Sequence, residues 1–426
     1  MSALFRNPNF TRMFLATVAS QLGTIVGNMA FAFYLLDRFS SQPGYASLAE
    51  LMYSLPTLFV FWAVGVVADR FDRQRIAEHA GWIRVGLTVV LIATLTAGWL
   101  PAAFAVLFLR SAVSKFYYPA ESAMLQGILK PDQYEQASGL NQTVMGVFTL
   151  LSVGIGAAAY HTIGIIGAVA TDGIGLALSA WLIRSCRISQ EVRLPNGKSS
   201  WRTIRFREVR NDFTEGLGYI QRKPLLLALV SGFLLFGLLN GGFAVLPLYT
   251  MKYKLAPDHY TFFSSLFAVF FGIGMLLGSI VGAAIVKKWR PHLVIPAGLL
   301  ATSLLGLVLL SATDPWMYLG TILVIGFTMA PVNVAIGGWM PSLVDPRQMG
   351  RVSAWNDPLL MLGQSVALGL IAWLYPHAMS LSFIYVSLSV ILFLSFFFYA
   401  GTLPRLQRKA LAEGAAGSQS SVSSAM

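Results

Sequence analysis

Long and nearly uninterrupted runs of apolar residues recur along this chain, separated by short polar segments. Each run holds about 20 residues, the length that an α-helix needs to cross a bilayer core of about 30 Å. The runs are continuous and do not alternate with a period of two, so they predict helices and not the strands of a membrane barrel. We expect twelve spans, at residues 11–36, 45–68, 78–98, 101–124, 141–160, 163–185, 225–250, 261–286, 292–311, 315–338, 356–375 and 379–401.

One polar segment is longer than the others and divides the spans into two groups of six. Within it, Arg207 to Arg222 has the periodicity of an amphipathic helix, which we expect to lie at the lipid headgroups; a regulatory or docking role is the alternative. The tail is rich in Ala, Gly and Ser, a composition typical of disorder. The predicted parts are an N-terminal six-helix bundle (1–185), a cytoplasmic linker (186–224), a C-terminal six-helix bundle (225–401) and a disordered cytoplasmic tail (402–426).

The two groups of spans share a sequence echo between their fourth and fifth members. Four residues recur at a constant offset of 215, as Pro131, Gln133, Ser138 and Asn141 and then Pro346, Gln348, Ser353 and Asn356. A second echo relates Gly65–Arg73 to Gly282–Arg290. Two halves on one plan are typical of transporters built from parallel repeats, which hold substrate between the halves near the bilayer midplane. Chance similarity of the loops is the alternative.

Composition supports a membrane solvent. Hydrophobic types make up 56% of the 426 residues and charged types 11%, against about 25% charged in soluble domains. The single cysteine, Cys186, excludes a disulfide framework or a cysteine metal cluster. The chain has no P-loop, no His-rich metal spacing and no nucleophile elbow. We therefore expect no metal, no cofactor and no enzyme activity.

The net charge of +12 raises the question of nucleic-acid binding. The basic residues argue against it, because they sit mainly in the gaps between spans. With the N-terminus in the cytoplasm, 24 of the 30 Lys and Arg residues lie on the cytoplasmic side, as the positive-inside rule requires. The even number of spans then places both termini in the cytoplasm, and the basic loops and tail are suited to anionic membrane lipids.

The loop after the second span carries a specific motif. It reads Gly65-Val-Val-Ala-Asp69-Arg70-Phe-Asp72-Arg73 and resembles the signature loop of the major facilitator superfamily, G-x-x-x-D-R-x-G-R followed by a basic residue. Asp72 replaces the usual Gly and Gln74 the usual basic residue. The form D-R-x-D-R resembles the drug:proton antiporter branch that includes macrolide efflux proteins and the enterobactin exporter.

Other stretches are similar to the same branch, namely Phe5–Phe10, Tyr118-Pro119-Ala120 and Glu215–Pro224. The fifth span departs from it, because it lacks the Gly-Pro pair that marks many antiporters. The resemblance covers residues 5–401. It implies an all-α membrane protein of twelve helices in two pseudo-symmetric six-helix halves, working as a monomer.

The resemblance implies an exporter of small amphipathic molecules such as drugs, which exchanges them for protons across a bacterial inner membrane. A dedicated exporter of an endogenous metabolite, such as a siderophore or a lipid-like compound, is the alternative within transport. A membrane enzyme or a non-transporting sensor on the same fold is the alternative from another class.

The signature loop supplies candidate gating residues. Asp69 lies at the cytoplasmic end of the second span, within reach of Arg70 and Arg73, and charges there can lock the ends of the two halves together. The resemblance adds an acidic partner at the cytoplasmic end of the fourth span, where Glu121 fits. We expect a relay of Asp69, Arg73 and Glu121 that closes the inner gate. The alternative is a basic loop that only sets topology.

Ionisable residues within the spans are candidates for proton coupling, because charge is costly in lipid. Glu50 lies in the outer part of the second span, Arg110 in the fourth and Asp172 in the sixth. Arg110 resembles the family's fourth-span arginine. A local hydrogen-bonded group is the alternative for Glu50, and a structural ion pair is the alternative for Arg110 and Asp172.

Polar side chains in the spans are candidates for substrate contact in an apolar cavity, since drug-sized ligands prefer apolar sites with a few polar groups. The first span carries a polar face that includes Thr24, and Tyr53 shares a face with Glu50 and Thr57. We expect substrate contacts from Gln21, Asn28, Tyr53, Tyr117, Asn240 and Asn333.

Overall fold

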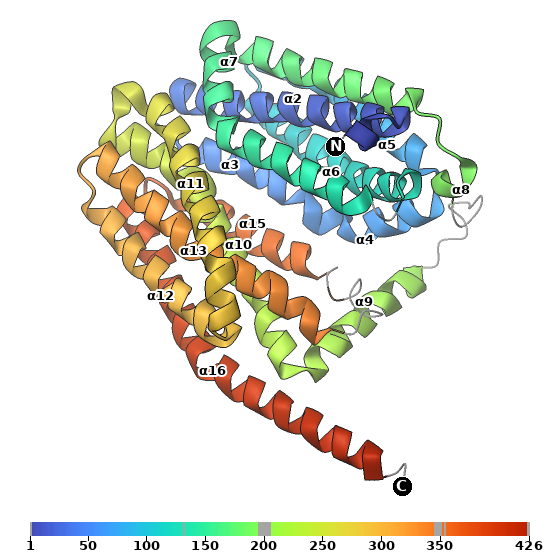
Figure 1. Ribbon diagram of the computed structural model, residues 1–426. Helices are drawn as coiled ribbons and strands as arrows, with labels where there is room; N and C mark the ends of the chain where they lie inside the picture. The colour runs from blue at the N-terminus through green and yellow to red at the C-terminus, as the bar shows by residue number, and fades with distance from the viewer. Residues whose placement is uncertain (1, 131–132, 195–205, 345–351, 353–354, 424–426) are drawn as a thin grey trace.

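The computed structural model describes residues 2–130, 133–194, 206–344, 352 and 355–423 (Figure 1). Helices are the regular structure throughout these ranges. The second copy of the Pro-Gln-Ser-Asn echo lies mostly outside the described residues, and so does the central part of the linker.

The first half consists of six helices after a short N-terminal turn. Proline stands in the first turn of several of them, where its missing N–H costs nothing. Asn7 caps the first long helix by accepting hydrogen bonds from the backbone of Asn9 and Phe10. The helices are α1 (Ser2–Phe5), α2 (Pro8–Arg38), α3 (Gly44–Ser54), α4 (Pro56–Arg70), α5 (Arg73–Thr96), α6 (Leu100–Ile128) and α7 (Tyr134–Ser185).

Helix α7 contains two membrane crossings. At about 1.5 Å per residue its 52 residues would extend roughly 78 Å, far more than the bilayer core. Gly164 has φ 67° and ψ 178°, outside the helical region, and the ribbon doubles back there (Figure 1). The first arm of α7 is the predicted fifth span and the second arm the sixth. Among the described residues eleven segments are long and apolar enough to cross a membrane, and the α7 segment, Gly139–Ser185, crosses twice.

The linker and the second half follow. The predicted amphipathic segment forms α9, and Pro begins α10, α12 and α13. A π-helical turn (Met251–Leu255) and two 3-10 turns (Pro257–His259 and Leu309–Ser311) lie at the helix ends. The helices are α8 (Gln190–Arg193), α9 (Phe206–Arg222), α10 (Pro224–Thr250), α11 (Tyr260–Lys288), α12 (Pro291–Val308), α13 (Pro315–Leu343), α15 (Asn356–Leu374) and α16 (Leu381–Ser423).

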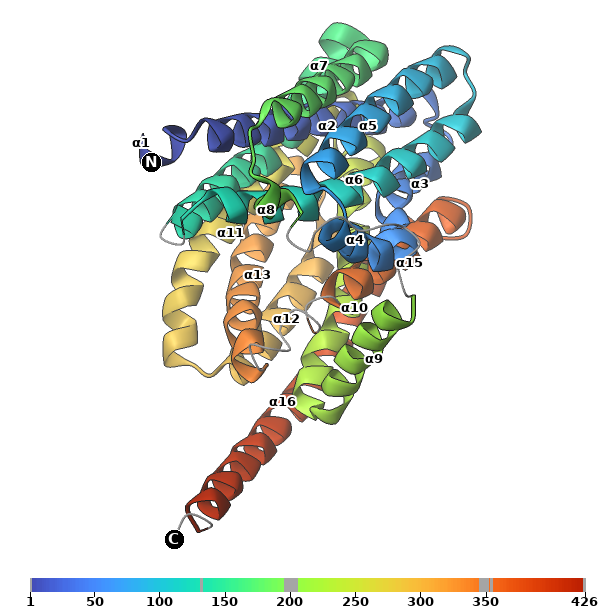
Figure 2. The ribbon, with the colours of Figure 1, turned by 90° about the vertical axis from the view of Figure 1, so that its right-hand side faces the viewer.

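The two halves repeat one pattern of helix pairing. Helix α2 packs against both arms of α7, and α10, the first span of the second half, packs against α15 and α16. Helix α5 likewise packs against the second arm of α7, as α12 packs against α16. The halves meet along α3 with α15 and along the first arm of α7 with α11. These four helices are the second and fifth spans of the halves, so the interface follows the same two-fold plan (Figure 2).

The ends of the spans lie on two sides of the protein, which we call the terminal side and the distal side and define by the segments that lie there. The terminal side carries the start of α2, the 71–72 turn and the linker. The distal side carries the 39–43 loop, Gly164, the 251–259 turns and the 375–380 loop. The positive-inside rule predicts that the terminal side faces the cytoplasm.

The tail differs from the expectation of disorder after residue 401. Helix α16 continues without a break to Ser423 and projects beyond the bundle in both views (Figures 1 and 2). The segment that follows Pro404 reads RLQRKALAE, and these residue types have high helix propensity. The Ala, Gly and Ser residues at the end of the tail therefore did not indicate the helix at its start.

Close backbone contacts between helices depend on glycine. A Cβ atom placed on Gly237 of α10 would lie 2.0 Å from the carbonyl oxygen of Leu360 in α15. A Cβ on Gly363 of α15 would lie 2.1 Å from the carbonyl oxygen of Leu234 in α10. Small residues let membrane helices approach closely in this way, and van der Waals packing then holds them together.

Substitution Gly237→Ala should destabilise the protein, because its Cβ meets backbone that cannot rotate away. Overpacking of this kind costs about 1–3 kcal/mol. Thermal unfolding of the purified protein in detergent measures the loss. Gly320→Ala is the control, since a Cβ there meets nothing within 4 Å. Equal melting temperatures for the two variants would show that the α10–α15 contact can relax.

Candidate functional site

A buried ion pair lies at mid-depth in the first half. The guanidinium of Arg110 in α6 pairs with the carboxylate of Asp172 in the second arm of α7. Thr24 of α2 donates to the other carboxylate oxygen at 3.1 Å, and Arg84 of α5 donates to the Thr24 hydroxyl at 3.0 Å. Four helices thus contribute to one hydrogen-bonded cluster. Sequence analysis singled out Arg110 and Asp172 separately, and the structure brings them together.

Helix α2 is packed directly onto this cluster. A Cβ on Gly27 would lie 3.1 Å from the Cβ of Asp172, and one on Gly23 would lie 3.0 Å from its Cα. The side chain of Asp172 is fully buried. This enclosure suits the structural alternative for Asp172 and Arg110, in which each neutralises the other.

Arg84 is a member of the cluster to which the sequence analysis gave no role. Its side chain is buried, and its Nε atom, like that of Arg110, has no hydrogen-bond partner. The cluster therefore contains two arginines and one carboxylate, of which only Arg110 bonds to the carboxylate directly, and it carries an excess positive charge. The signal was available in the sequence, because an arginine within a span is a functional candidate by default.

Glu50 of α3 stands apart from that pair. Its side chain is half-buried, and within the described part of the chain its carboxylate makes no hydrogen bond or ion pair. Neighbours on its helix contact the second half: Ser47 bonds to the Tyr249 hydroxyl, and the hydroxyl oxygens of Ser54 and Ser365 lie 3.1 Å apart. Residues three and four apart share a helix face, so Glu50 lies on the side of α3 that meets the other half.

The distal ends of the halves are fastened together. Asp37, at the end of α2, accepts from Lys252 at 2.6 Å and from the Tyr260 hydroxyl at 2.7 Å. The Tyr249 hydroxyl donates to the carbonyl of Pro43 at 2.5 Å, and the Tyr253 hydroxyl to that of Ser40 at 3.0 Å. These bonds cross from the second half to the first and hold the distal side closed.

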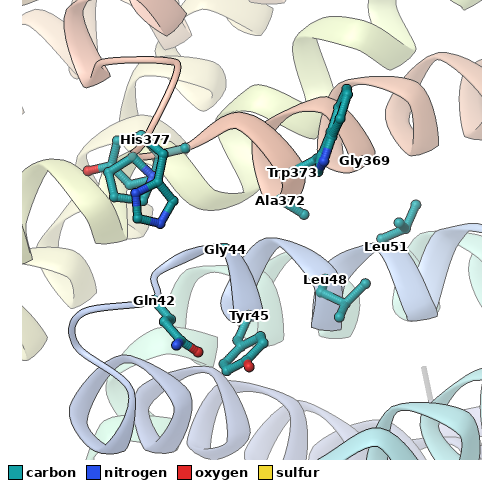
Figure 3. Close-up of a pocket in the computed structure, with 11 residues that line it drawn as sticks. Gln42, Gly44, Tyr45, Leu48, Leu51, Gly369, Ala372, Trp373 and His377 are labelled. Carbon is teal, nitrogen blue, oxygen red and sulfur yellow. The ribbon is translucent and has the colours of Figure 1, made fainter.

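A shallow groove of about 370 Å³ follows the distal seam between α3 and α15 (Figure 3). Tyr45 and Leu48 line it on one side, and Trp373 on the other. The lining is mainly apolar, and Trp373 is 80% exposed. None of the residues predicted to contact substrate or protons lines this groove.

At the terminal side, the two departures from the signature loop have structural partners. Asp72 caps α5 through the backbone N–H of Arg75 and pairs with Arg193 of α8. The Gln74 amide donates at 2.8 Å to the carbonyls of Ile183 and Cys186, at the end of α7. Both residues therefore tie the beginning of the linker to α5. The sequence shows the two departures but not these contacts.

The predicted gating residues lie at the same side. The side chain of Asp69 is outside the described residues, so the relay stays a prediction. Arg70 follows it at the end of α4. Arg73 donates to the carbonyl of Val192 in α8 at 3.3 Å. Glu121 is buried within the first half and accepts a hydrogen bond from Thr17 of α2.

The residues predicted to contact substrate divide into two groups. Tyr117 is buried inside the first half, where its hydroxyl lies 3.3 Å from that of Ser179, so it is closed to a ligand in this conformation. The others are at least partly accessible. Asn240 is exposed and its amide donates to Gln364 at 3.4 Å, Asn333 is exposed, and Gln21, Asn28 and Tyr53 are half-buried.

Sequence comparisons identify relatives over most of the chain. The family model of the Major Facilitator Superfamily matches residues 13–368. The uncharacterized MFS-type transporter YkuC of Bacillus subtilis (strain 168) is 51% identical over 409 residues, which cover 96% of this chain and 95% of that protein. Macrolide efflux protein A of Streptococcus pyogenes is 24% identical over 84% of this chain and 87% of its own.

The fold has solved counterparts. A POT family transporter, crystallised with a thioalcohol conjugated peptide, superposes with a TM-score of 0.72 over 93% of this chain and 96% of that one, at 12% identity. This likeness concerns the helix arrangement alone. Together with the family model and the 51% identical relative, it leads to one conclusion: the chain belongs to the major facilitator superfamily, and is a multi-pass membrane transporter and not an enzyme.

Proposed function

We propose that this transporter exports small amphipathic molecules such as drugs by alternating access, in exchange for protons. The similarity to macrolide efflux protein A supports export. The carboxylate of Glu50 supports proton exchange and carries the proposal. A carboxylate in a low-dielectric span that lacks a cationic partner can hold a proton and release it.

Glu50 is the best carrier among the carboxylates deep in the described spans. Asp172 is paired with Arg110, and Glu121 accepts a hydrogen bond from Thr17. Protonation of either must disturb an existing bond. Glu50 has no such bond to lose, and its face of α3 meets the second half. Arg110 and Asp172 then act as the element that responds to the proton.

Alternating access requires the two sides to open in turn. In this conformation the distal side is fastened by Asp37, Lys252 and the tyrosines beside them. On the terminal side, the Lys115 ammonium of α6 interacts electrostatically with Asp357, at the start of α15. Within the described residues, neither side chain forms an ion pair. We propose that this pair forms when the distal contacts break.

The predicted inner gate belongs to the same movement. Asp69 and Arg70 lie at the terminal end of α4 and Arg73 at the start of α5. Helices α3 and α4 form the second span, which meets α15. Gln21, Asn28, Tyr53, Asn240 and Asn333 would offer polar contacts to a substrate held between the halves. The terminal side faces the cytoplasm of a bacterium in this proposal, so substrate enters there.

Substitution Glu50→Gln should abolish the response to a pH gradient. The amide cannot carry a proton, so gradient-driven efflux of a hydrophobic cationic dye from proteoliposomes should fall roughly tenfold or more. Glu78→Gln is the matched control, because Glu78 makes only a peripheral pair with Arg184. Binding of the dye to the purified variant should persist.

Two other outcomes would redirect the proposal. Gradient-driven efflux that survives in Glu50→Gln would assign the proton to Asp172 or Arg110. No transport of any hydrophobic cation or neutral drug by the intact protein would contradict the drug reading and favour a dedicated exporter of a siderophore or a lipid-like metabolite.

Cross-linking across the seam tests alternating access. The hydroxyl oxygens of Ser54 and Ser365 are 3.1 Å apart, so Ser54→Cys with Ser365→Cys should form a disulfide under mild oxidation. The native thiol should not interfere, because burial raises the pKa of Cys186 to about 11 and little thiolate forms. The disulfide should stop dye efflux and reduction should restore it, with each single variant unaffected. Full activity of the oxidised double variant would contradict movement at this seam.

A further inference from the structure

The hydroxyl of Tyr53 is buried without a hydrogen-bond partner. Buried tyrosine hydroxyls usually find one, and an unpaired one indicates a water molecule or a transferred proton at that place. The residue is held firmly, because its carbonyl accepts a hydrogen bond from the Ser111 hydroxyl at 2.7 Å. Ser111 directly follows Arg110 in α6, so the backbone of α3 is tied to the helix that carries the ion pair.

Three charged groups act on the Tyr53 hydroxyl. They are Glu50, one turn nearer the distal side on the same helix face, and Arg110 and Asp172, which form the buried pair. The hydroxyl is therefore within electrostatic range of both the unpaired carboxylate and the paired one. Thr57, one turn further along, also has a buried hydroxyl without a partner, as does the Nε of Arg110. Unpaired donors on neighbouring helices are suited to hold ordered water.

The charges around this point balance only in one protonation state. Arg84 and Arg110 supply two positive charges, and Asp172 supplies one negative charge. An ionised Glu50 makes the group neutral, and a protonated Glu50 leaves one excess positive charge. The protonation state of Glu50 therefore changes the net charge around the Arg110–Asp172 pair, and Tyr53 is acted on by both.

We propose that Tyr53 relays a proton between Glu50 and Asp172, with a water molecule completing the path; this rests on the proposed proton exchange. The proton leaves the Glu50 carboxyl for the Tyr53 oxygen, while the phenolic proton passes through the water to the Asp172 carboxylate. Tyr53 ends neutral, Glu50 ends ionised and Asp172 ends protonated. No charge is created and no other reactant is needed.

The relay links the proton to movement. A protonated Asp172 no longer neutralises Arg110, and the Gly23–Gly27 stretch of α2 lies directly on Asp172. A change in the pair must therefore shift α2, α6 and α7 relative to one another. Helix α3, which carries both Glu50 and Tyr53, also carries the Ser54 contact to the second half.

The pH response of cross-linking tests the relay without a known substrate. In the Ser54→Cys/Ser365→Cys protein in liposomes, the rate of disulfide formation is measured from pH 5.5 to 8. Thiolate ionisation makes disulfide formation faster as the pH rises in every variant, so the proposed exchange is measured as an additional transition on that rise. Glu50→Gln should remove this transition and leave only the thiolate rise. Tyr53→Phe, which removes only the hydroxyl, should move the midpoint of the transition by about half to one pH unit, as expected for one lost hydrogen bond.

The control lies on the same helix. The ring of Tyr45 packs against Phe39 and Phe104 at the distal end, away from Arg110 and Asp172. Tyr45→Phe removes only its hydroxyl and should leave the midpoint unchanged. Thr57→Val is a second variant of nearly the same shape, which removes another unpaired hydroxyl from the water site and should shift the midpoint by less. It keeps the test open if Tyr53→Phe folds poorly.

The titratable and charged groups that face this region are few enough to assign the response. Among the described residues, Glu50 of α3, Arg110 of α6 and Asp172 of α7 act on Tyr53 directly. Arg84 of α5 and Tyr117 of α6 surround the same pair, Tyr249 of α10 bonds to Ser47 of α3, and Lys115 of α6 interacts with Asp357 of α15. If Tyr53→Phe and Thr57→Val behave as Tyr45→Phe does while Glu50→Gln abolishes the response, the relay is overturned and the proposed exchange stands. A normal response in Glu50→Gln overturns both.

Discussion

The hydrocarbon core of the bilayer offers no hydrogen-bond partner, so the polar groups at that depth must find their partners inside the protein. That constraint explains why the spans are helices. It also explains why Arg84, Arg110 and Thr24 gather around the carboxylate of Asp172. A buried polar group without a hydrogen-bond partner costs free energy, and packing alone does not explain why it is kept. Among the described residues of the first half, these groups are the hydroxyls of Tyr53 and Thr57 and the Nε atoms of Arg84 and Arg110.

Much of the fold was predictable because its driving force is local in sequence. A run of apolar residues marks a span wherever it occurs, and basic gaps and prolines mark the ends. Glu50, Arg110 and Asp172 were identifiable for the same reason, since a charge within a span is conspicuous by itself. Helix α16 continues into the tail, which the Ala, Gly and Ser content of the tail does not indicate, because the helix-forming residues that follow Pro404 precede that composition.

What the sequence could not supply is which distant residues meet. Arg110 and Asp172 are 62 positions apart and lie on different helices, so their pairing depends on the rotation and depth of both. The role of Asp72 was hidden in the same way, since Arg193 lies across the terminal side in α8. Tyr117 was expected to contact substrate, and in this conformation its side chain is buried inside the first half beside Ser179. Sequence spacing predicts which residues share a helix face, but the packing of neighbouring helices decides where that face points.

The distribution of charge divides the work between the halves. In the second half, Asp, Glu, Lys, Arg and His are absent from the predicted spans apart from their first two residues, where His292 and Asp357 stand. At mid-depth it offers hydroxyls and amides instead, such as the hydrogen-bonded Thr250, Tyr385 and Tyr318. A proton that crosses the bilayer midplane on side chains must therefore travel in the first half. In the proposed exchange the second half senses the proton only through the seam. Helix α3 both carries Glu50 and packs against α15, so the proposed coupling and gating converge on one helix.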